Sequence, residues 1–217
     1  LLRTHCTLSH IPQVWDTQSQ ALISSYNQKN SNGAVLQWTD DESLCCHLVT
    51  NEVRIMRGTD LSAGAIARCF HKGLTSYRVS PVTSSGTGCV IAVFQPEKGG
   101  KHAQANLYTY SDSGEADEDV KGPHASRSMF SASEANMLWN ATGTAVLVHT
   151  MSDVDRSNSS YYGSTGLFAL GTADLKDFTE IVPQSKDGPI YDVQVRVSVS
   201  LCASLCASLC ASLCASL

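Results

Sequence analysis

The chain has 217 residues, of which 16% are charged, and its formal net charge is −5. This length allows one or two ordinary domains with a sizeable core. The acidic balance is not the clustered Lys and Arg that nucleic-acid binding favours, although net charge does not describe how charges are distributed. No stretch is long and apolar enough to span a membrane, and no secretory signal is recognisable, so no membrane partner is expected.

Short strands separated by polar turns fill the first part of the chain. The segment QVWDTQSQALISSY predicts a strand ending at Trp15 and Asp16, a polar turn and a second strand. The segment AVLQWTDDESLCCHLVTNEVRIMRG predicts a strand, a turn at Asp40, an apolar strand, a second turn and a strand over 52–56. Asp, Asn, Ser and Gly are typical of such turns because they relieve backbone strain. The next segment, DLSAGAIARCF, fits a helical turn or a loop with an outer strand equally well.

The same arrangement recurs twice further along the chain. The segment SYRVSPVTSSGTGCVIAVFQPEKGGKHAQANLYTYS predicts a strand, a turn at Pro81, a buried strand over 89–94, a Gly-Gly hairpin and a strand. The acidic segment SDSGEADEDVKGPHAS then predicts a solvated loop, with an acidic binding site as the alternative. NMLWNATGTAVLVHT begins the arrangement again, with Trp139 before a turn at Asn140 and Gly143.

The turn marks at Trp38-Thr39, Ser80-Pro81 and Trp139-Asn140 recur at intervals of about 40 to 60 residues, which is typical of propeller blades. Each blade has four antiparallel strands and buries its faces only against neighbouring blades. We therefore predict an all-β fold, a partial WD40-like β-propeller of consecutive four-stranded antiparallel blades. In this fold Trp15, Asp16, Trp38, Asp40, Pro81, Trp139, Asn140 and Gly143 are structural turn and blade residues.

Signals for catalysis or for bound metals and cofactors are weak. Cys45, Cys46 and Cys89 lie in apolar runs, where a free cysteine behaves as a small hydrophobic residue, and no zinc spacing occurs. The segment SSGTGC lacks the third glycine of a dinucleotide loop, and YYGSTG is not a nucleophile elbow. His47 and His149 lie in or beside strands and are interpreted as packing residues rather than catalytic ones. We expect no enzyme activity, no metal and no cofactor.

The repeat LCASLCASLCASLCASL ends the chain. Its identical copies fit a translated tandem repeat, and read as a strand it would be far longer than real strands. We therefore assign residues 1–194 to the partial propeller and residues 195–217 to a non-native or disordered low-complexity tail. The tail is aggregation-prone and is left out of the functional argument.

The polar segment SDVDRSNSSYYG allows three interpretations. It is a connecting hairpin whose aspartates cap turns, with Trp139 packed between blades. Alternatively it contacts RNA or protein, with Arg156 pairing with phosphate and Tyr161 or Tyr162 stacking on an exposed base. Calcium binding is disfavoured because the segment lacks the further oxygen ligands of an EF-hand loop.

Six stretches carry a resemblance to a known family: QWTDDESLCCHLVTNEV, VSPVTSSGTGCVIAVFQPEKGG, GPHAS, MLWNATGTAVLV, SDVDRSNSSYYG and GPIYDVQ. In this order they resemble the eukaryotic translation initiation factor 2A proteins over about residues 11–194. The resemblance implies a large WD-repeat-like propeller that binds the small ribosomal subunit and initiator methionyl-tRNA without GTP hydrolysis, in the cytoplasm. Other initiation factors and mRNA are further implied partners.

This chain departs from the family pattern at both ends. It begins with Leu1 rather than methionine, and after GPIYDV the pattern gives way to QVRVSVS and the repeat. We therefore expect a fragment with about three complete blades and parts of two others. Two other functions stay open. One is a generic WD40-like scaffold for protein partners, and the other is the non-catalytic propeller of a larger hydrolase or a secreted enzyme fragment. A basic face on the folded propeller favours the initiation factor, whereas a flat, apolar or acidic face favours the scaffold.

Overall fold

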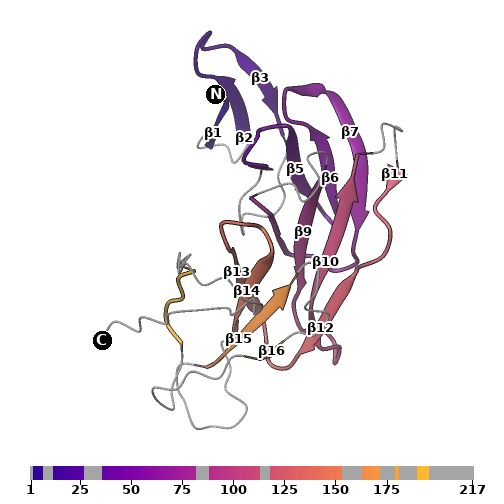
Figure 1. Ribbon diagram of the computed structural model, residues 1–217, viewed down its shortest axis with the longest axis vertical. Helices are drawn as coiled ribbons and strands as arrows, with labels where there is room; N and C mark the ends of the chain where they lie inside the picture. The colour runs from indigo at the N-terminus through magenta and orange to yellow at the C-terminus, as the bar shows by residue number, and fades with distance from the viewer. Residues whose placement is uncertain are drawn as a thin grey trace, which may run out of the picture.

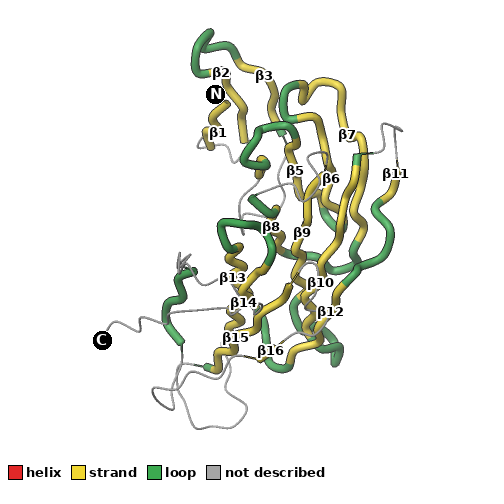
Figure 2. Tube along the Cα trace, viewed as in Figure 1, coloured by secondary structure: helices red, strands yellow, loops and turns green. Residues whose placement is uncertain are grey.

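The structure, a computed structural model, describes residues 2–6, 12–26, 36–81, 88–112, 118–152, 163–171, 179–180 and 190–195. All regular structure in these ranges is β-strand (Figures 1 and 2). The described residues form no helix that could cross a membrane. The predicted all-β class is confirmed.

Four sheets follow one another along the chain, and each is an up-and-down antiparallel meander, to which the second sheet adds one short parallel strand described below. The first contains β1 (Leu2–Cys6), β2 (Pro12–Asp16) and β3 (Leu22–Ser25). The second contains β4 (Leu36–Trp38), β5 (Leu44–Val49), β6 (Glu52–Arg57) and β7 (Asp60–Phe70). The third contains β8 (Ser76–Val79), β9 (Gly88–Gln95), β10 (Ala103–Ser111) and β12 (Ala125–Met129). The fourth contains β13 (Glu134–Trp139), β14 (Ala145–Ser152), β15 (Ser164–Gly171) and β16 (Thr179–Glu180).

The burial of each strand reflects its place within its sheet. The second strands β5, β9 and β14 are buried along nearly their whole length, as their continuous apolar sequences predict. The outer strand β12 instead alternates between buried and exposed residues. One cluster of buried side chains packs the second sheet against the third, and another packs the third against the fourth. Each sheet therefore buries its faces against its neighbours, as the blades of a propeller do.

The first strands of successive sheets lie next to one another. The Gln37 side chain of β4 donates to the carbonyl of Tyr77 at 2.9 Å and accepts from the backbone N–H of Val79 at 3.0 Å, both in β8. The indole N–H of Trp139 in β13 donates to the carbonyl of Arg78 at 3.3 Å. Strands β4, β8 and β13 are thus the inner strands of their sheets, each next to the inner strand of the adjoining sheet. The described sheets do not close into a ring, so the predicted partial propeller is confirmed.

Two segments with uncertain predictions have a defined structure. DLSAGAIARCF is the outer strand β7 and not a helical turn. Within the acidic segment predicted as a solvated loop, Glu118–Asp119 forms β11, which pairs in parallel with β7. Val120 anchors this pairing, since its N–H donates to the carbonyl of Arg68 at 2.9 Å and its side chain packs on the core. Part of the connection between β10 and β12 of the third sheet therefore pairs with the second sheet.

The predicted boundary at residue 194 stays a prediction. Val193 is buried against the fourth sheet, in a cluster with Leu147 and Leu167. Residues 196–217, which include the whole repeat, lie outside the described residues.

Candidate nucleic-acid interface

Connections between antiparallel strands emerge alternately at the two ends of a sheet, and in sheets two to four these ends differ. We name as the turn end the described residues 39–43, 58–59, 80–81, 112 and 140–144. We name as the loop end residues 50–51, 71–75, 96–102 and 130–133.

The turn end repeats one hydrogen-bonding device in three successive sheets. The residue after each inner strand is Thr39, Ser80 or Asn140. This residue makes two hydrogen bonds to one residue of the second strand. Its N–H donates to the carbonyl of that second-strand residue at 2.8–3.1 Å, and its side-chain oxygen accepts from the N–H of that second-strand residue at 3.1–3.2 Å. Those second-strand residues are Leu44, Val90 and Ala145. A short polar side chain therefore closes each turn, which is why the sequence has Thr, Ser or Asn there.

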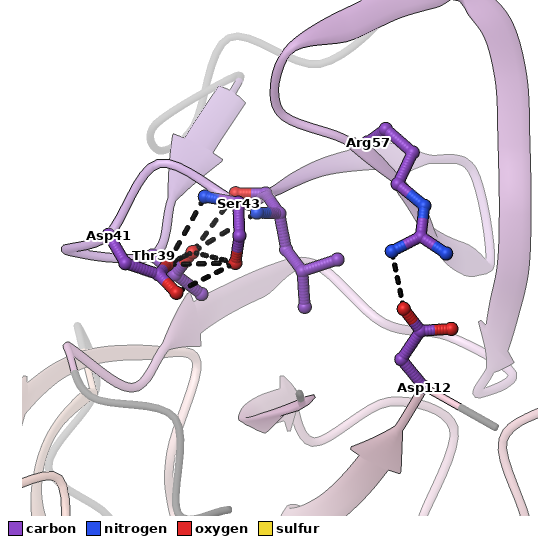
Figure 3. A network of polar contacts seen from close by, with 6 residues as sticks. Thr39, Asp41, Ser43, Arg57 and Asp112 are labelled. Carbon is purple, nitrogen blue, oxygen red and sulfur yellow. Dashed lines mark hydrogen bonds and ion pairs between the residues drawn. The ribbon is translucent and has the colours of Figure 1, made fainter. Parts of the chain in front are cut away.

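A carboxylate reinforces this device in the second sheet. The Thr39 hydroxyl donates to Asp41 at 2.6 Å, and the hydroxyl of Ser43 donates to the same carboxylate at 2.8 Å (Figure 3). The Thr39 hydroxyl, followed by the hydroxyl and N–H of Ser43, lowers the pKa of Asp41. The N–H of Asp40 donates to the carbonyl of Pro81 at 3.0 Å, which joins this turn to that of the third sheet. Asp40 and Pro81 thus meet across two sheets.

The remaining predicted turn and blade residues have distinct surroundings. Trp38 and Trp139 are both half-buried beside core clusters, but the buried indole N–H of Trp38 has no hydrogen-bond partner, in contrast to that of Trp139. Gly143 has a φ of 65°, which glycine adopts without strain, and its N–H donates to the carbonyl of Asn140 at 3.0 Å. In the first sheet, Trp15 is 36% exposed and Asp16 caps its own turn through the N–H of Gln18 at 2.9 Å.

The charged residues of the turn end are acidic. Asp40, Asp41, Glu42 and Asp112 are the charged side chains of its described residues. The nearest strand-end cation, Arg57, forms an ion pair with Asp112 that links the second and third sheets (Figure 3). This end therefore repels phosphate.

The loop end is anchored differently, because each of its inter-sheet loops binds the next sheet. His71 contacts the hydroxyl of Tyr108 at 2.9 Å and the side chain of Gln95 at 3.0 Å, and both partners belong to the third sheet. The N–H of Thr75 donates to the carbonyl of Phe94 at 3.0 Å. Between these anchors Lys72 is exposed and, among the described residues, has no carboxylate partner.

A lysine-flanked hairpin lies beside this loop. Lys98 and Lys101 exchange backbone hydrogen bonds of 3.2 Å across Gly99 and Gly100, whose φ values are 60° and 78°. Positive φ at both central residues is the type I′ hairpin geometry, which glycine favours. Both lysines are exposed, and His102 follows them directly. The local signal KGGK thus produces a rigid turn with a cation on each side.

The loop at 130–133 completes this end. Its Ala132 carbonyl accepts from the N–H of Glu97 at 2.9 Å, and the N–H of Ser131 donates to the Glu97 carboxylate at 2.9 Å. Phe130 is 75% exposed, and its ring contacts that of His102 at a centroid distance of 4.4 Å. The hairpin and the loop therefore form one continuous surface.

The predicted contact residues Arg156, Tyr161 and Tyr162 lie outside the described residues. Their segment joins β14 to β15, and these strands meet the loop end at Ser152 and Ser164. Sequence reasoning missed Lys72, Lys98, Lys101, His102 and Phe130, which lie at this same end. The KGGK signal was visible, but it was interpreted only as a hairpin.

Buried titratable groups lie in the strands between the two ends. Burial, with nearby Arg54, lowers the pKa of His47 to about 4, and burial lowers the pKa of His149. The Nε2 atoms of both rings lack partners. Cys45, Cys46, Cys69 and Cys89 are buried free thiols, and burial raises the pKa of Cys45 and of Cys69 to about 12. No cluster of three metal-ligating side chains occurs within the described ranges.

Sheets that adjoin through their inner strands and bury their faces against one another define a β-propeller, here an open part of one. A solved structure described as the crystal structure of the eukaryotic initiation factor matches it with a TM-score of 0.63 and 30% identity, covering 88% of this chain and 43% of that one. The family model of the eukaryotic translation initiation factor eIF2A matches residues 127–199.

Curated relatives agree with this match. The chain is 39% identical to the eukaryotic translation initiation factor 2A of Schizosaccharomyces pombe, over 83% of this chain and 29% of that protein. It is 37% identical to that of Dictyostelium discoideum, over 83% of this chain and 28% of that protein. The chain belongs to the eukaryotic translation initiation factor 2A family. It spans less than a third of the length of these relatives.

Proposed function

We propose that this chain is part of a translation initiation factor that binds the small ribosomal subunit and initiator methionyl-tRNA through the loop end. The family supports a role in translation initiation. The observation that carries the binding proposal is a group of exposed lysines at the loop end, opposite to the carboxylates of the turn end. These lysines have no carboxylate partner within the part of the chain that the structure describes.

Charge separation makes this proposal compatible with a net charge of −5. Phosphate contacts depend on local cations, and a surface with Lys72, Lys98 and Lys101 attracts an RNA backbone even when the whole chain is acidic. The carboxylates of the turn end repel the same backbone, so the two ends together orient the propeller on RNA. Binding of this kind needs no chemical step, no cofactor and no GTP hydrolysis, and its setting is the cytoplasm.

The segment SDVDRSNSSYYG extends this proposal. Because β14 and β15 open toward the loop end, Arg156 is a candidate for a phosphate contact there, and Tyr161 or Tyr162 for a base contact. This assignment is separate from that of the lysines and is tested separately.

Co-sedimentation of the full-length protein with small ribosomal subunits across a salt series tests the proposal. Lys72→Glu should weaken binding several-fold and lower the salt slope by about one unit, since one phosphate contact is lost. Lys121→Glu is the matched control, because it makes the same charge change at an exposed residue outside the loop end. Arg156→Ala should have a similar but smaller effect than Lys72→Glu.

Equal effects of Lys72→Glu and Lys121→Glu would refute a role for the loop end. Absence of wild-type co-sedimentation at low salt would refute subunit binding itself. Unchanged binding by Arg156→Ala would indicate that the segment SDVDRSNSSYYG has only a structural role, and it would not affect the assignment of the lysines.

One observation favours a scaffold for protein partners as the second candidate. Trp15, Leu22 and Ile23 of the first sheet are 36%, 48% and 40% exposed, and apolar side chains of this kind suit a protein contact. Leu22→Glu should then reduce binding of protein partners while leaving the RNA-dependent salt slope unchanged.

A further inference from the structure

We propose that Phe130, His102, Lys98 and Lys101 form a binding site for single-stranded RNA, which we name the Phe130 site. An unpaired base would stack on the Phe130 ring while the flanking phosphates contact the two lysines. The inference deepens the proposed function and rests on it only for the identity of the RNA.

The strand register brings the rings of Phe130 and His102 together, and the two lysines lie in the hairpin that leads into His102. Ala103 of β10 pairs with Met129 of β12 at the last ladder position, so His102 and Phe130 are the next residues on each strand. Their rings meet at a centroid distance of 4.4 Å and an interplanar angle of 63°. Despite this contact, Phe130 is 75% exposed, so much of its ring is open to solvent.

The backbone holds this arrangement in place. The Glu97 carboxylate accepts from the N–H of Ser131, and the N–H of Glu97 donates to the carbonyl of Ala132, each at 2.9 Å. These bonds fix the base of the lysine hairpin to the loop that carries Phe130. Because the Gly99-Gly100 turn is itself closed by two backbone bonds, the lysines project from a rigid support, which lowers the ordering entropy of binding.

The chemistry of the site fits a single strand better than a duplex or an acidic peptide. A duplex hides the faces of its bases within the stack, whereas a single strand offers them to an exposed aromatic ring. An acidic peptide would use the lysines but would leave the Phe130 ring face without a stacking partner. An exposed ring with cations at its side is the combination that single-stranded RNA binders use.

The second sheet provides an internal comparison. Phe70 is the counterpart of Phe130, since Cys69 pairs with Val53 as Met129 pairs with Ala103, and Phe70 is 65% exposed. The residue opposite Phe70 is Glu52, however, which pairs with Arg54, and the adjoining turn at Thr50 and Asn51 has no lysine. The residue opposite the exposed ring is therefore Glu52 in the second sheet and His102, which follows the lysine hairpin, in the third.

Fluorescence anisotropy with the full-length protein and a labelled twelve-residue uridine oligonucleotide tests the site. Phe130→Ala should weaken binding by roughly tenfold, the loss expected for one stacked base. Phe130→Trp should retain binding because the ring face is kept. Lys98→Ala combined with Lys101→Ala should weaken binding and lower the salt slope by about 1.4 units, the value for two phosphate contacts to a single strand.

Phe70→Ala is the matched control and should bind as the wild type does. A duplex RNA of equal length and a poly-glutamate peptide of equal length should both bind more weakly than the oligonucleotide. Circular dichroism and melting temperature identify any variant that fails to fold. If a Phe130 variant fails to fold, Phe130→Tyr, which keeps an aromatic ring, is compared with Phe130→Leu, which removes it.

Equal losses for Phe130→Ala and Phe70→Ala, or tighter binding of the duplex or the peptide, would overturn the inference. These outcomes are distinct from failure of the proposed function, which is read from wild-type co-sedimentation with ribosomal subunits. If the wild type binds ribosomal subunits but Phe130→Ala binds the oligonucleotide as tightly as the wild type does, the proposed function stands and the Phe130 site is refuted.

Discussion

The two ends of the sheets use hydrogen bonds in opposite ways. At the turn end, Thr39, Ser80 and Asn140 bond to the strand that follows within their own sheet. At the loop end, His71, Thr75 and Ser131 bond to the adjoining sheet or loop. The repeated device of the first end thus stabilises each sheet internally, in addition to the Asp40–Pro81 and Arg57–Asp112 links between the second and third sheets. The second end connects sheets and loops, and its lysines have no carboxylate partner among the described residues. Variants at the turn end should change stability, and variants at the loop end should change binding.

The largest stability effect is expected for Asn140→Ala. The side chain of Asn140 accepts from the N–H groups of Thr144 at 2.9 Å and Ala145 at 3.1 Å and donates to the Thr144 hydroxyl at 2.9 Å. Loss of these bonds should lower the free energy of unfolding by about 2 kcal/mol, measured by urea denaturation. Asn140→Thr should recover much of the loss, since Thr39 fills the equivalent position. An Asn140→Ala variant of unchanged stability, or one with altered RNA binding, would break the separation between the two ends.

A smaller effect on stability, joined to an effect on binding, is expected for Gly100→Val. Gly100 has a φ of 78°, and a β-branched residue is strained there, so stability should fall by about 1–2 kcal/mol. The strain should displace Lys98 and Lys101 and weaken binding of the uridine oligonucleotide. Gly99→Asn, which suits the first central position of a type I′ turn, should keep both properties. Normal oligonucleotide binding by folded Gly100→Val would show that the hairpin geometry is irrelevant to the lysines.

The smallest effect is a pH dependence at the turn end. Hydrogen bonds from Thr39 and Ser43 lower the pKa of Asp41 in the folded state. The ionised Asp41 carboxylate therefore stabilises the fold above the unfolded pKa of about 3.9, and this stabilisation is lost as the pH falls through the folded pKa. Asp41 is exposed, so the difference in unfolding free energy between wild type and Asp41→Asn should be only about 0.5 kcal/mol at pH 6 and should vanish in acid. Urea denaturation at pH 6 and at pH 3 measures it. A difference that grows in acid would contradict the assigned hydrogen bonds.

Local sequence signals predicted the strands and turns because they depend on neighbouring residues. The run over Leu44–Val49 is mostly apolar at successive positions. The side chains of Thr39, Ser80 and Asn140 each bond to a residue at most ten positions further on. The pairing of Glu118–Asp119 with β7 could not be predicted in this way, since it joins residues about fifty positions apart through a two-residue strand.

The candidate site was predicted less completely for the same reason. Lys98 and Phe130 are distant in sequence, and only the β10–β12 register places them on one surface. The net charge of −5 also concealed that Lys72, Lys98 and Lys101 gather at one end, away from the carboxylates of the turn end. Arg156, Tyr161 and Tyr162 were selected from composition alone, and their contact role stays a prediction.

The buried cysteines can report when neighbouring sheets separate, because they lie in the clusters between the sheets. Cys45 lies in the cluster between the first and second sheets, whereas Cys69 and Cys89 lie in the cluster between the second and third. Burial keeps the Cys45 and Cys69 thiols protonated at neutral pH, and a protonated thiol does not react with alkylating reagents. Alkylation at each position therefore proceeds only in molecules whose adjoining sheets have separated. The order in which these thiols become labelled is the order in which the propeller segment comes apart.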